Sequence, residues 1–267
     1  MRKNVKTIPT LAGLLLLLTG VAGGVFLVEE GGALRLRAYA QISPQNVTPS
    51  NISDSSMTIN WTTAEKTKGF IVFGKNKNYL KGATLENIQG EVHSVDLTGL
   101  SPSSAYYFKI NLKGMEFDND GAPWRVQTGP VLSQQPSSKV ISGALIDSSG
   151  GVVQEALVFV SLPGGSILST KTSENGLWAI PLSPSRSQDL SSYMPVKNGS
   201  YLNIFIQAGR AGKTAAFAPF NEGSSLPVMT LGKTYYFKEG ALREIDNIPE
   251  ANVNLPQVLT PSPTIIP

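Results

Sequence analysis

Short stretches of alternating apolar and polar residues recur along most of this chain. In residues 57–61, MTINW, the methionine, isoleucine and tryptophan share one face of an extended strand, and the threonine and asparagine share the other. Residues 106–114, YYFKINLKG, alternate in the same way and end at a glycine. Because turn residues separate such stretches and no helical period intervenes, the pattern predicts an all-β chain of short strands.

The first group of strands spans residues 42–129. Besides the two stretches above, FIVFG at 70–74, EVHSVDL at 91–97 and PWRVQTG at 123–129 are typical of strands, and the last of them begins with proline, as edge strands allow. In EVHSVDL, His93 shares a face with a valine and a leucine, which predicts a partly buried packing position rather than a catalytic base. Strands that recur in this way predict a β-sandwich.

The stretch LTGLSPSSAYYFKI predicts how the chain crosses from one sheet to the other. Leu97 and Leu100 are expected to fill the end of the core, and Pro102 to stiffen the bend. The ring of Tyr106 is expected to enter the core while its hydroxyl returns to the preceding backbone, an arrangement called a tyrosine corner. Together with Trp61, these residues are the predicted structural core of the first domain.

The order of these residues resembles a fibronectin type III domain. Trp61 falls where that family carries its early core tryptophan, and Leu100, Pro102 and Tyr106 fall on its Leu-x-Pro-x-x-x-Tyr corner. The segment KNKNYLKGATLENIQG, residues 75–90, departs from the usual pattern of the middle strands. The chain has no Arg-Gly-Asp sequence, so the resemblance implies no integrin-type recognition.

A second group of strands, residues 139–237, follows a linker at 130–138. Asn175 and Gly176 predict a turn before Trp178, which is expected to be a core residue of this domain. The stretches ISGALIDSSG, EALVFV and TKTSENGLWAI resemble a carboxypeptidase regulatory-like domain, a prealbumin-like sandwich. That resemblance implies an accessory β-sandwich and no peptidase activity.

Two details of the second domain follow from the same pattern. Val158 and Val160 are expected on one face of a strand and Phe159 on the other. The stretch SPSRSQDLSSYMPVKNGS, residues 183–200, is long for a hairpin connection and predicts an inserted loop.

The beginning of the chain predicts a membrane anchor. An uncharged apolar run at 7–28 follows three basic residues in the segment 1–6 and precedes a linker at 29–41. A helix of roughly 20 residues crosses the hydrocarbon core, and the flanking charges place the first residues inside and the remainder outside. The alternative is a secretory signal peptide cleaved after Ala40, which would release the protein.

Residues 238–267 lose the strand pattern. The stretch EGALREI predicts at most one or two helical turns, and repeated prolines then predict an extended, semi-rigid tail. The last apolar residues are far too few to span a membrane.

Composition excludes several kinds of chemistry. The chain has no cysteine and one histidine, so we expect no disulfide, thiolate site or histidine-rich metal cluster. Charged residues make up 15% and the net charge is +3, which is too little for a nucleic-acid interface. The acidic residues are scattered, without the paired carboxylates that glycoside hydrolysis requires. We therefore expect no cofactor, no metal and no enzymatic activity.

Two motifs only partly match ligand-binding loops. AGRAGKT at 208–214 ends like a phosphate-binding loop but lacks its first glycine and a following helix, so a hairpin turn is favoured. DNDG at 118–121 has alternating acids but lacks the other ligands of a calcium loop, so an exposed turn is favoured. Glycosylation-type sequences begin at Asn46, Asn51, Asn60 and Asn198 and are compatible with a location outside the cytoplasm.

These observations favour a membrane-anchored surface protein whose two tandem β-sandwiches recognise protein or carbohydrate or act as a spacer, as in adhesion. Tyr107, Trp124 and Tyr193 could form an aromatic binding patch, although ordinary strand packing is the simpler interpretation. The alternative hypothesis is an accessory, non-catalytic fragment of a secreted hydrolase, because the same modules accompany catalytic domains.

Overall fold

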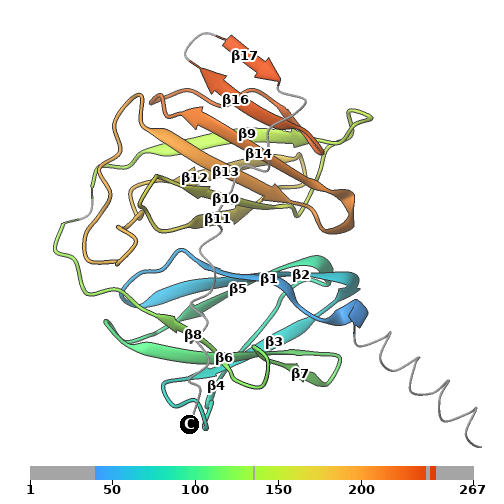
Figure 1. The fold of residues 1–267 in the computed structure, drawn as a ribbon, viewed down its shortest axis with the longest axis vertical. Helices are drawn as coiled ribbons and strands as arrows, with labels where there is room; N and C mark the ends of the chain where they lie inside the picture. The colour runs from blue at the N-terminus through green and yellow to red at the C-terminus, as the bar shows by residue number, and fades with distance from the viewer. Residues whose placement is uncertain (1–39, 135, 239–240, 245–267) are drawn as a thin grey trace, which may run out of the picture. The chain divides into compact units, whose positions relative to one another are not determined.

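The computed structural model describes residues 40–134, 136–238 and 241–244. Residues 40–42 are helical, and strands β1–β17 and a 3-10 turn, η1, follow in a compact unit comprising Pro44–Pro267 (Figure 1). The described part of the chain is therefore nearly all β, as the alternating pattern predicts.

The predicted membrane anchor at 7–28 lies outside the described residues, as do the segment 1–6 and nearly all of the linker 29–41. Within the residues that the structure describes, no helix is long and apolar enough to cross a membrane.

The first group of strands forms two antiparallel sheets. One has the strand order β1-β2-β5; the other has the order β4-β3-β6-β7, with β8 also paired to β6. The bounds are β1 (Gln45–Ser50), β2 (Ser56–Thr67), β3 (Gly69–Gly74), β4 (Gly82–Leu85), β5 (Gly90–Thr98), β6 (Ala105–Leu112), β7 (Met115–Phe117) and β8 (Trp124–Gln127). This arrangement is a β-sandwich, which we call the first sandwich.

Alternation along the strands builds the core between these sheets. β6 buries every second residue from Tyr106 to Leu112, and Trp61 on β2 and Leu97 on β5 have no exposed surface. Leu100 is also buried. Pro102 is exposed, so it does not belong to the core and contributes only the rigidity of its ring to the bend.

Tyr106 has the contacts of a tyrosine corner. Its ring is 6% exposed, and its hydroxyl oxygen accepts a hydrogen bond of 2.8 Å from the backbone N–H of Ser101. Tyr106 thereby fixes the turn that precedes its own strand, because its hydroxyl is bonded to the backbone five residues earlier in the sequence.

The Tyr106→Phe variant is expected to lose about 1 kcal/mol of the free energy of unfolding, the net value of a hydrogen bond. The ring stays in the core while the N–H of Ser101 loses its acceptor. Urea unfolding of both proteins measures the difference. Tyr107→Phe, on the opposite face of the same strand, is the matched control and should change stability less.

The second group of strands forms a second sandwich. One sheet has the order β11-β10-β13-β14-β16-β17 and the other the order β12-β9-β15. β14–β16 and β9–β15 are parallel pairs, and the other pairs are antiparallel. The bounds are β9 (Val140–Ile146), β10 (Leu157–Ser161), β11 (Leu168–Lys171), β12 (Leu177–Pro181), β13 (Tyr201–Gln207), η1 (Gly209–Ala211), β14 (Lys213–Pro219), β15 (Met229–Thr230), β16 (Thr234–Lys238) and β17 (Ala241–Glu244).

The core of the second sandwich lies between these two sheets. Val158, Val160 and Trp178 belong to its buried cluster, whereas Phe159 points the other way into a separate cluster. The turn before Trp178 closes at Gly176, whose φ of 70° lies in the left-handed region that glycine adopts without strain. The strand faces are therefore those that the alternation predicts.

The end of the second sandwich differs from the sequence prediction. β16 runs to Lys238, and β17 pairs with it in antiparallel register, so the predicted helical turns at EGALREI are wrong. Pairing with a neighbouring strand supplies hydrogen bonds that a short isolated helix lacks, which is why tertiary context prevails here. The rest of the predicted tail, residues 245–267, lies outside the described residues.

The inserted loop at 183–200 is tied down on both sides. Isolated bridges pair Arg186 with Tyr193 and Gly165 with Ser187, and the guanidinium of Arg186 lies 5.5 Å from the centre of the Tyr193 ring. The loop therefore holds one charged side chain in a fixed place.

Candidate functional site

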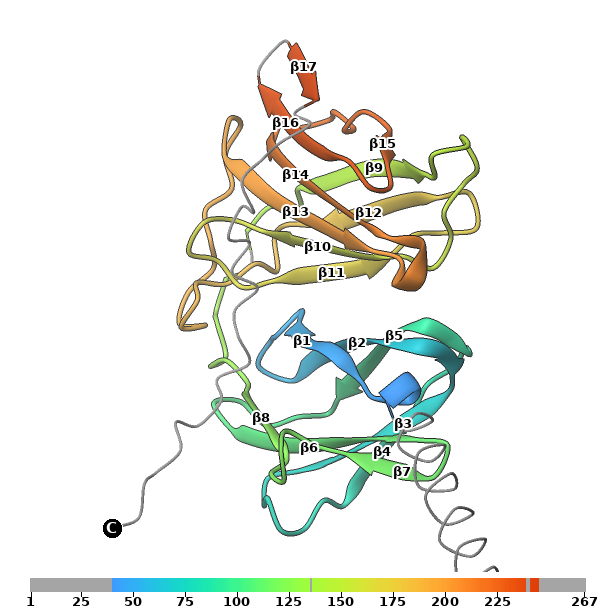
Figure 2. The ribbon, with the colours of Figure 1, turned by 45° about the vertical axis from the view of Figure 1, so that its right-hand side comes forward.

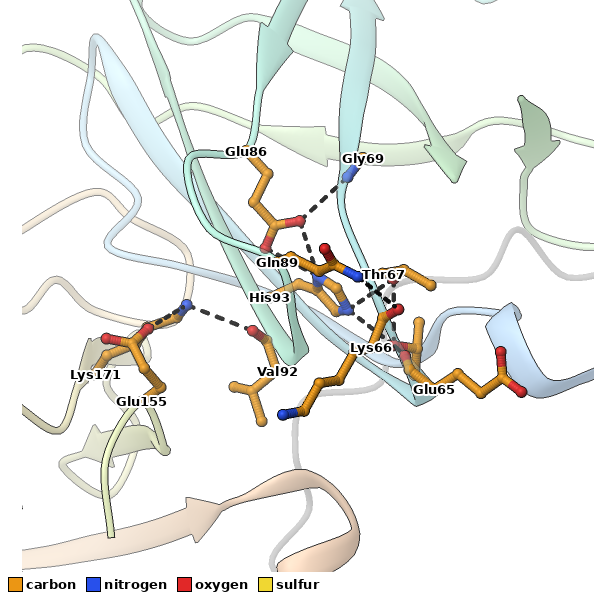
Figure 3. A network of polar contacts seen from close by, with 11 residues as sticks. Glu65, Lys66, Thr67, Gly69, Glu86, Gln89, Val92, His93, Glu155 and Lys171 are labelled. Atoms are coloured by element: carbon orange, nitrogen blue, oxygen red, sulfur yellow. Dashed lines mark hydrogen bonds and ion pairs between the residues drawn. The ribbon is translucent and has the colours of Figure 1, made fainter. Parts of the chain in front are cut away.

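A buried polar cluster surrounds His93, the single histidine of the chain. His93 on β5 has no exposed surface, and Glu86, just after β4, is 4% exposed. Nδ1 of His93 lies 2.9 Å from each carboxylate oxygen of Glu86 (Figure 3). Nε2 lies 2.9 Å from Oγ1 of Thr63 and 3.2 Å from Oγ1 of Thr67, both on β2. We call these four residues the His93 cluster.

The hydrogen bonds determine where the protons lie in the His93 cluster. The hydroxyl of Thr63 donates to the carbonyl oxygen of Glu65 at 2.6 Å, so Oγ1 of Thr63 accepts from Nε2 of His93. Nδ1 then either donates to the Glu86 carboxylate or accepts from its carboxyl group. In both cases one proton lies between Nδ1 and Glu86.

Two further contacts hold the cluster in place. The imidazole stacks on the indole of Trp61, with ring centroids 4.9 Å apart and planes 6° from parallel. The backbone N–H of Gly69 donates to the second carboxylate oxygen of Glu86 at 3.3 Å. Glu86 therefore ties the start of β3 and the end of β4 to the core, and the cluster is closed to solvent.

A second group of contacts joins the two sandwiches. The pattern places Thr58, Asn60 and Thr62 on the polar face of β2, yet all three are buried. The amide of Asn60 donates to Thr48 O at 3.0 Å and to Ser50 Oγ at 2.7 Å. The second sandwich contacts this face, where the side-chain amide of Gln207 donates to Oγ1 of Thr62 at 3.3 Å. We call the contact region the intersandwich interface.

Asn51 and Ser169 form the centre of this interface. The side-chain oxygen of Asn51 accepts from the backbone N–H of Ser169 at 2.9 Å, and its amide donates to the Ser169 carbonyl at 3.1 Å. Oγ of Ser169 lies 2.6 Å from Oγ of Ser50, and the N–H of Asn51 donates to Ile167 O at 2.9 Å. Reciprocal hydrogen bonds of this kind, as between two paired strands, fix both the alignment of the Asn51 and Ser169 segments and the distance between them.

Arg186 crosses the interface from the inserted loop. Its side chain is 2% exposed, and Nη1 donates to Pro130 O at 2.7 Å while Nη2 lies 3.3 Å from a carboxylate oxygen of Asp54. One guanidinium thereby joins the loop, the linker and the first sandwich. A Cβ added at Gly129 would collide with Nη1, so the glycine leaves the room that Arg186 occupies.

An ion pair closes one side of the interface. Nε of Arg210, in η1, donates to Glu91 at 2.9 Å, and the backbone N–H of Arg210 donates to the other carboxylate oxygen at 3.1 Å. This hydrogen bonding holds the pKa of Glu91 below its ordinary value of 4.5 and raises that of Arg210. The pair involves an exposed guanidinium, so its stabilisation is weakened by solvent.

Acidification is expected to weaken this ion pair. Because the pKa of Glu91 is lowered in the folded chain, its stabilisation is present above pH 4.5 and is lost as the pH falls through the folded-state value. The melting temperatures of the wild type and Glu91→Gln should therefore differ at pH 6 and converge once the pH has fallen below the folded-state pKa of Glu91. Glu174→Gln, at an exposed turn, is the control, and a constant gap would contradict the assignment.

Apolar residues complete the interface. Val92 of the first sandwich packs in one buried cluster with Leu157, Phe159 and Ile167 of the second. Nζ of Lys171 donates to Val92 O at 3.4 Å, as Figure 3 shows. The interface therefore combines an apolar centre with specific polar contacts.

The motifs singled out in the sequence do not assemble a reaction centre. AGRAGKT is the hairpin between β13 and β14, as expected, and β14 follows it where a phosphate-binding loop needs a helix. In DNDG, Asp118 accepts from the N–H of Gly121 at 2.8 Å and pairs with Lys109. Across the described residues, no group of three or more histidine, cysteine or acidic side chains could hold a metal ion.

The proposed aromatic patch and two of the glycosylation-type sequences are not available in the folded chain. Trp124 is buried against Phe108, and Tyr193 lies over Arg186, so with Tyr107 they form no common surface. The amides of Asn51 and Asn60 are occupied by the hydrogen bonds above, whereas Asn46 and Asn198 are exposed.

Sequence reasoning missed the partners of these sites. Glu86 stands only seven positions before the single histidine, a weak signal that an acid reaches it. No local pattern marks Arg186, Asn51 or Ser169, because each acquires its role from residues more than 50 positions away.

The family model that matches this chain covers the first sandwich. Residues 43–127 match the model of the purple acid phosphatase N-terminal domain, whose fold is fibronectin III-like. The strand order of the first sandwich and this match define a fibronectin III-like β-sandwich. A search of curated proteins found no match.

Solved structures with similar arrangements are distant. The structure of PhoD shares 14% identity over 37% of this chain, with a TM-score of 0.28, and the chain covers 21% of it. The chicken CNTN1 FN1–FN3 domains share 12% identity over 72% of this chain and 67% of theirs, with a TM-score of 0.26. A two-domain fibronectin type III segment of chicken tenascin shares 11% identity over 66% of this chain and 99% of its own, with a TM-score of 0.23. These TM-scores are too low to carry an argument about function.

Proposed function

We propose that this chain is a non-catalytic pair of β-sandwiches that acts as a rigid spacer outside the cytoplasm and presents a surface for protein or carbohydrate recognition. The observation that carries the proposal is the intersandwich interface. Domains joined only by a linker move independently unless a substantial interface connects them. Here Asn51, Ser169 and Arg186 are committed to holding one sandwich against the other.

The nature of the His93 cluster supports a non-catalytic role. A general base must reach a proton of its substrate, and His93 has no exposed surface. Its contacts are with Thr63, Thr67, Glu86 and Trp61, all of which belong to the core of the first sandwich. We assign the cluster to stability. Phosphomonoester hydrolysis by the purified chain that disappears in a His93 variant would overturn this part.

The location of the protein is part of the proposal. The apolar run at 7–28 supports a single-pass anchor with the two sandwiches on the outer side of a membrane. We also infer that the second sandwich is a prealbumin-like accessory module, on the strength of the motifs at 141–180. We propose no nucleic-acid partner, because a net charge of +3 is too weak to hold a phosphate backbone.

Rigidity between the sandwiches is directly measurable because the chain has no cysteine of its own. Spin labels at Asn78→Cys and Glu174→Cys, both exposed, report the distance between the two sandwiches. We expect one narrow distance distribution. A broad distribution, as for beads on a string, would overturn the spacer role.

One observation favours a second candidate, an accessory part of a secreted hydrolase. The match of residues 43–127 is to a domain that belongs to phosphatases. The mass of the native polypeptide separates the candidates. A product close to 28.4 kDa supports the spacer, and a much heavier product with phosphatase activity supports the hydrolase.

A further inference from the structure

The part of the first sandwich that contains β3 and β4 is strongly cationic. Residues 66–90 contain five lysines and one acid, Glu86, and so have a formal charge of +4. The whole chain has a net charge of +3, so all the other residues together have a charge of −1. Glu86 is buried in the His93 cluster, whereas the five lysines are exposed: Lys66, Lys68, Lys75, Lys77 and Lys81. We call residues 66–90 the cationic edge.

The lysines of the cationic edge have no carboxylate partner. In the part of the chain that the structure describes, none of them belongs to an ion pair. Nζ of Lys81 lies instead 4.7 Å from the centre of the Tyr79 ring. Lys109, on the next strand of the same sheet, differs because it is paired with Glu116 at 2.7 Å and with Asp118 at 3.4 Å. The positive charge of the cationic edge is therefore available to a partner.

Large apolar side chains are exposed among these lysines. Tyr79, in the loop between β3 and β4, is 62% exposed; Leu85, at the end of β4, is 71% exposed; and Ile88, in the following loop, is 55% exposed. β4 is the last strand of its sheet and pairs with β3 alone among the described strands, as Figure 2 shows. Charge and apolar surface therefore occur together at one border of the first sandwich.

The hairpin that presents Tyr79 has a fixed backbone. Phe73 on β3 pairs with Gly82 on β4. Within the loop, the N–H of Tyr79 donates to Asn76 O at 3.0 Å, and the N–H of Asn78 donates to Oδ1 of Asn76 at 2.9 Å. Binding through a segment that is already ordered loses less conformational entropy. The hairpin is therefore suited to contact a partner without refolding.

Two simpler explanations account for only half of this surface. Lysines next to an edge strand prevent other chains from pairing with it, and a soluble acidic partner would also require lysines. Neither explains three exposed apolar side chains, because such residues at a sheet edge favour association. A bilayer with anionic lipids matches both features. Its headgroups attract lysines, while apolar and tyrosine side chains enter the layer between headgroups and acyl chains.

We propose that the cationic edge binds the surface of a bilayer that contains anionic lipids. The lysines of the hairpin at 75–81 contact the headgroups, and Tyr79, Leu85 and Ile88 enter the interfacial layer. Each lysine close to an anionic surface strengthens binding about fivefold, so the three lysines of the hairpin together contribute roughly 100-fold. This is a second membrane contact, separate from the apolar run at 7–28.

This contact is compatible with the spacer role. The second sandwich contacts the other sheet of the first sandwich, through Ser50 on β1, Thr62 on β2 and Val92 on β5. The cationic edge lies in the sheet that contains β3 and β4. The proposal goes beyond the proposed function, and its failure would leave the spacer role intact, since the distance between the two sandwiches is measured without lipid.

Fluorescence quenching by lipids tests the proposal in the full chain. The chain has no cysteine, so a nitrobenzoxadiazole dye on Asn78→Cys reports on the hairpin alone. The vesicles contain a quencher-labelled lipid in phosphatidylcholine, with or without phosphatidylglycerol. We expect several-fold stronger quenching with phosphatidylglycerol. The same dye on Glu174→Cys, in the second sandwich, is the control and should be quenched equally in both vesicles. Equal quenching of the Asn78→Cys dye in both would overturn the proposal.

Two triple variants separate local charge from net charge. Lys75→Gln/Lys77→Gln/Lys81→Gln should reduce the quenching of the Asn78→Cys dye to its level in phosphatidylcholine. The matched control removes three exposed lysines elsewhere, lowers the net charge equally and should retain the quenching: Lys113→Gln/Lys197→Gln/Lys213→Gln. Because all six side chains are exposed, circular dichroism should be unchanged in both variants. Equal loss in both, or no loss in the first, would contradict the proposed contact.

The apolar side chains distinguish a bilayer from an acidic protein. Leu85→Asn/Ile88→Asn should reduce the quenching several-fold, because the polar side chains do not enter the interfacial layer. Binding of polyglutamate, followed by the anisotropy of the same dye, should stay unchanged in this variant. If the quenching also stays unchanged, the cationic edge recognises charge alone, as for an acidic protein, and the assignment to a bilayer is wrong.

Discussion

The Glu86→Ala variant is expected to lose about 3–5 kcal/mol of the free energy of unfolding, the cost of removing one partner from a buried charged or proton-sharing pair. Alanine leaves Nδ1 of His93 without a partner where water cannot replace it, and it removes the acceptor of the Gly69 N–H. Urea unfolding followed by circular dichroism measures the loss. A change below about 0.5 kcal/mol, typical of a surface substitution, would contradict the role of the pair.

The matched control is Glu86→Gln. The glutamine amide has the same shape, and it can donate to Nδ1 while its oxygen accepts from Gly69. It should therefore retain more stability than alanine. Because His93 is the only histidine, its two ring nitrogens give unambiguous 15N signals, and their protonation in the wild type and in Glu86→Gln locates the shared proton.

The Arg186→Ala variant is expected to uncouple the two sandwiches. In the wild type, the nearly inaccessible guanidinium of Arg186 donates to Pro130 O and pairs with Asp54. Hydrogen bonds to charged groups contribute about 1.5–3 kcal/mol to the free energy of unfolding. We expect an overall loss of about 2–3 kcal/mol, because the Asp54 side chain is 32% exposed and its share is reduced by solvent. The single unfolding transition should divide into two, as calorimetry would show.

Gly129→Ala provides an independent approach to the same contact. Its Cβ would occupy the position of the Arg186 guanidinium, so the arginine stays in the chain but loses its place. Both variants should broaden the distance between labels at Asn78→Cys and Glu174→Cys. Lys197→Ala, which removes an exposed cation within the inserted loop itself, is the control and should leave the distance distribution narrow. A narrow distance distribution in both Arg186→Ala and Gly129→Ala would show that Arg186 does not hold the sandwiches together.

The elements of the first sandwich follow from its sequence because the signals are local. Apolar alternation of period two places Trp61 and Tyr106 on the inner faces, and the bend before Tyr106 is encoded within five residues. The same logic places Val158 and Phe159 on opposite faces of β10. Alternation does not identify what covers the outer face.

Local signals were misleading at the end of the second sandwich. EGALREI has short-range helical character, yet Ala241–Glu244 form β17 because β16 offers a neighbouring edge. A one-turn helix has few internal hydrogen bonds, whereas pairing with β16 supplies hydrogen-bond partners for the backbone N–H and C=O groups of β17. The local sequence of EGALREI contains no signal for this pairing.

By itself, the sequence determined the β class, the inner faces of most strands and the turns between them, since these depend on residues a few positions apart. Only the tertiary structure decided that the polar face of β2 is buried, that Glu86 reaches His93 and that Arg186 joins both sandwiches. The physical reason is that a polar residue is compatible equally with water and with a well-placed partner. Which of the two it meets depends on the packing of distant segments.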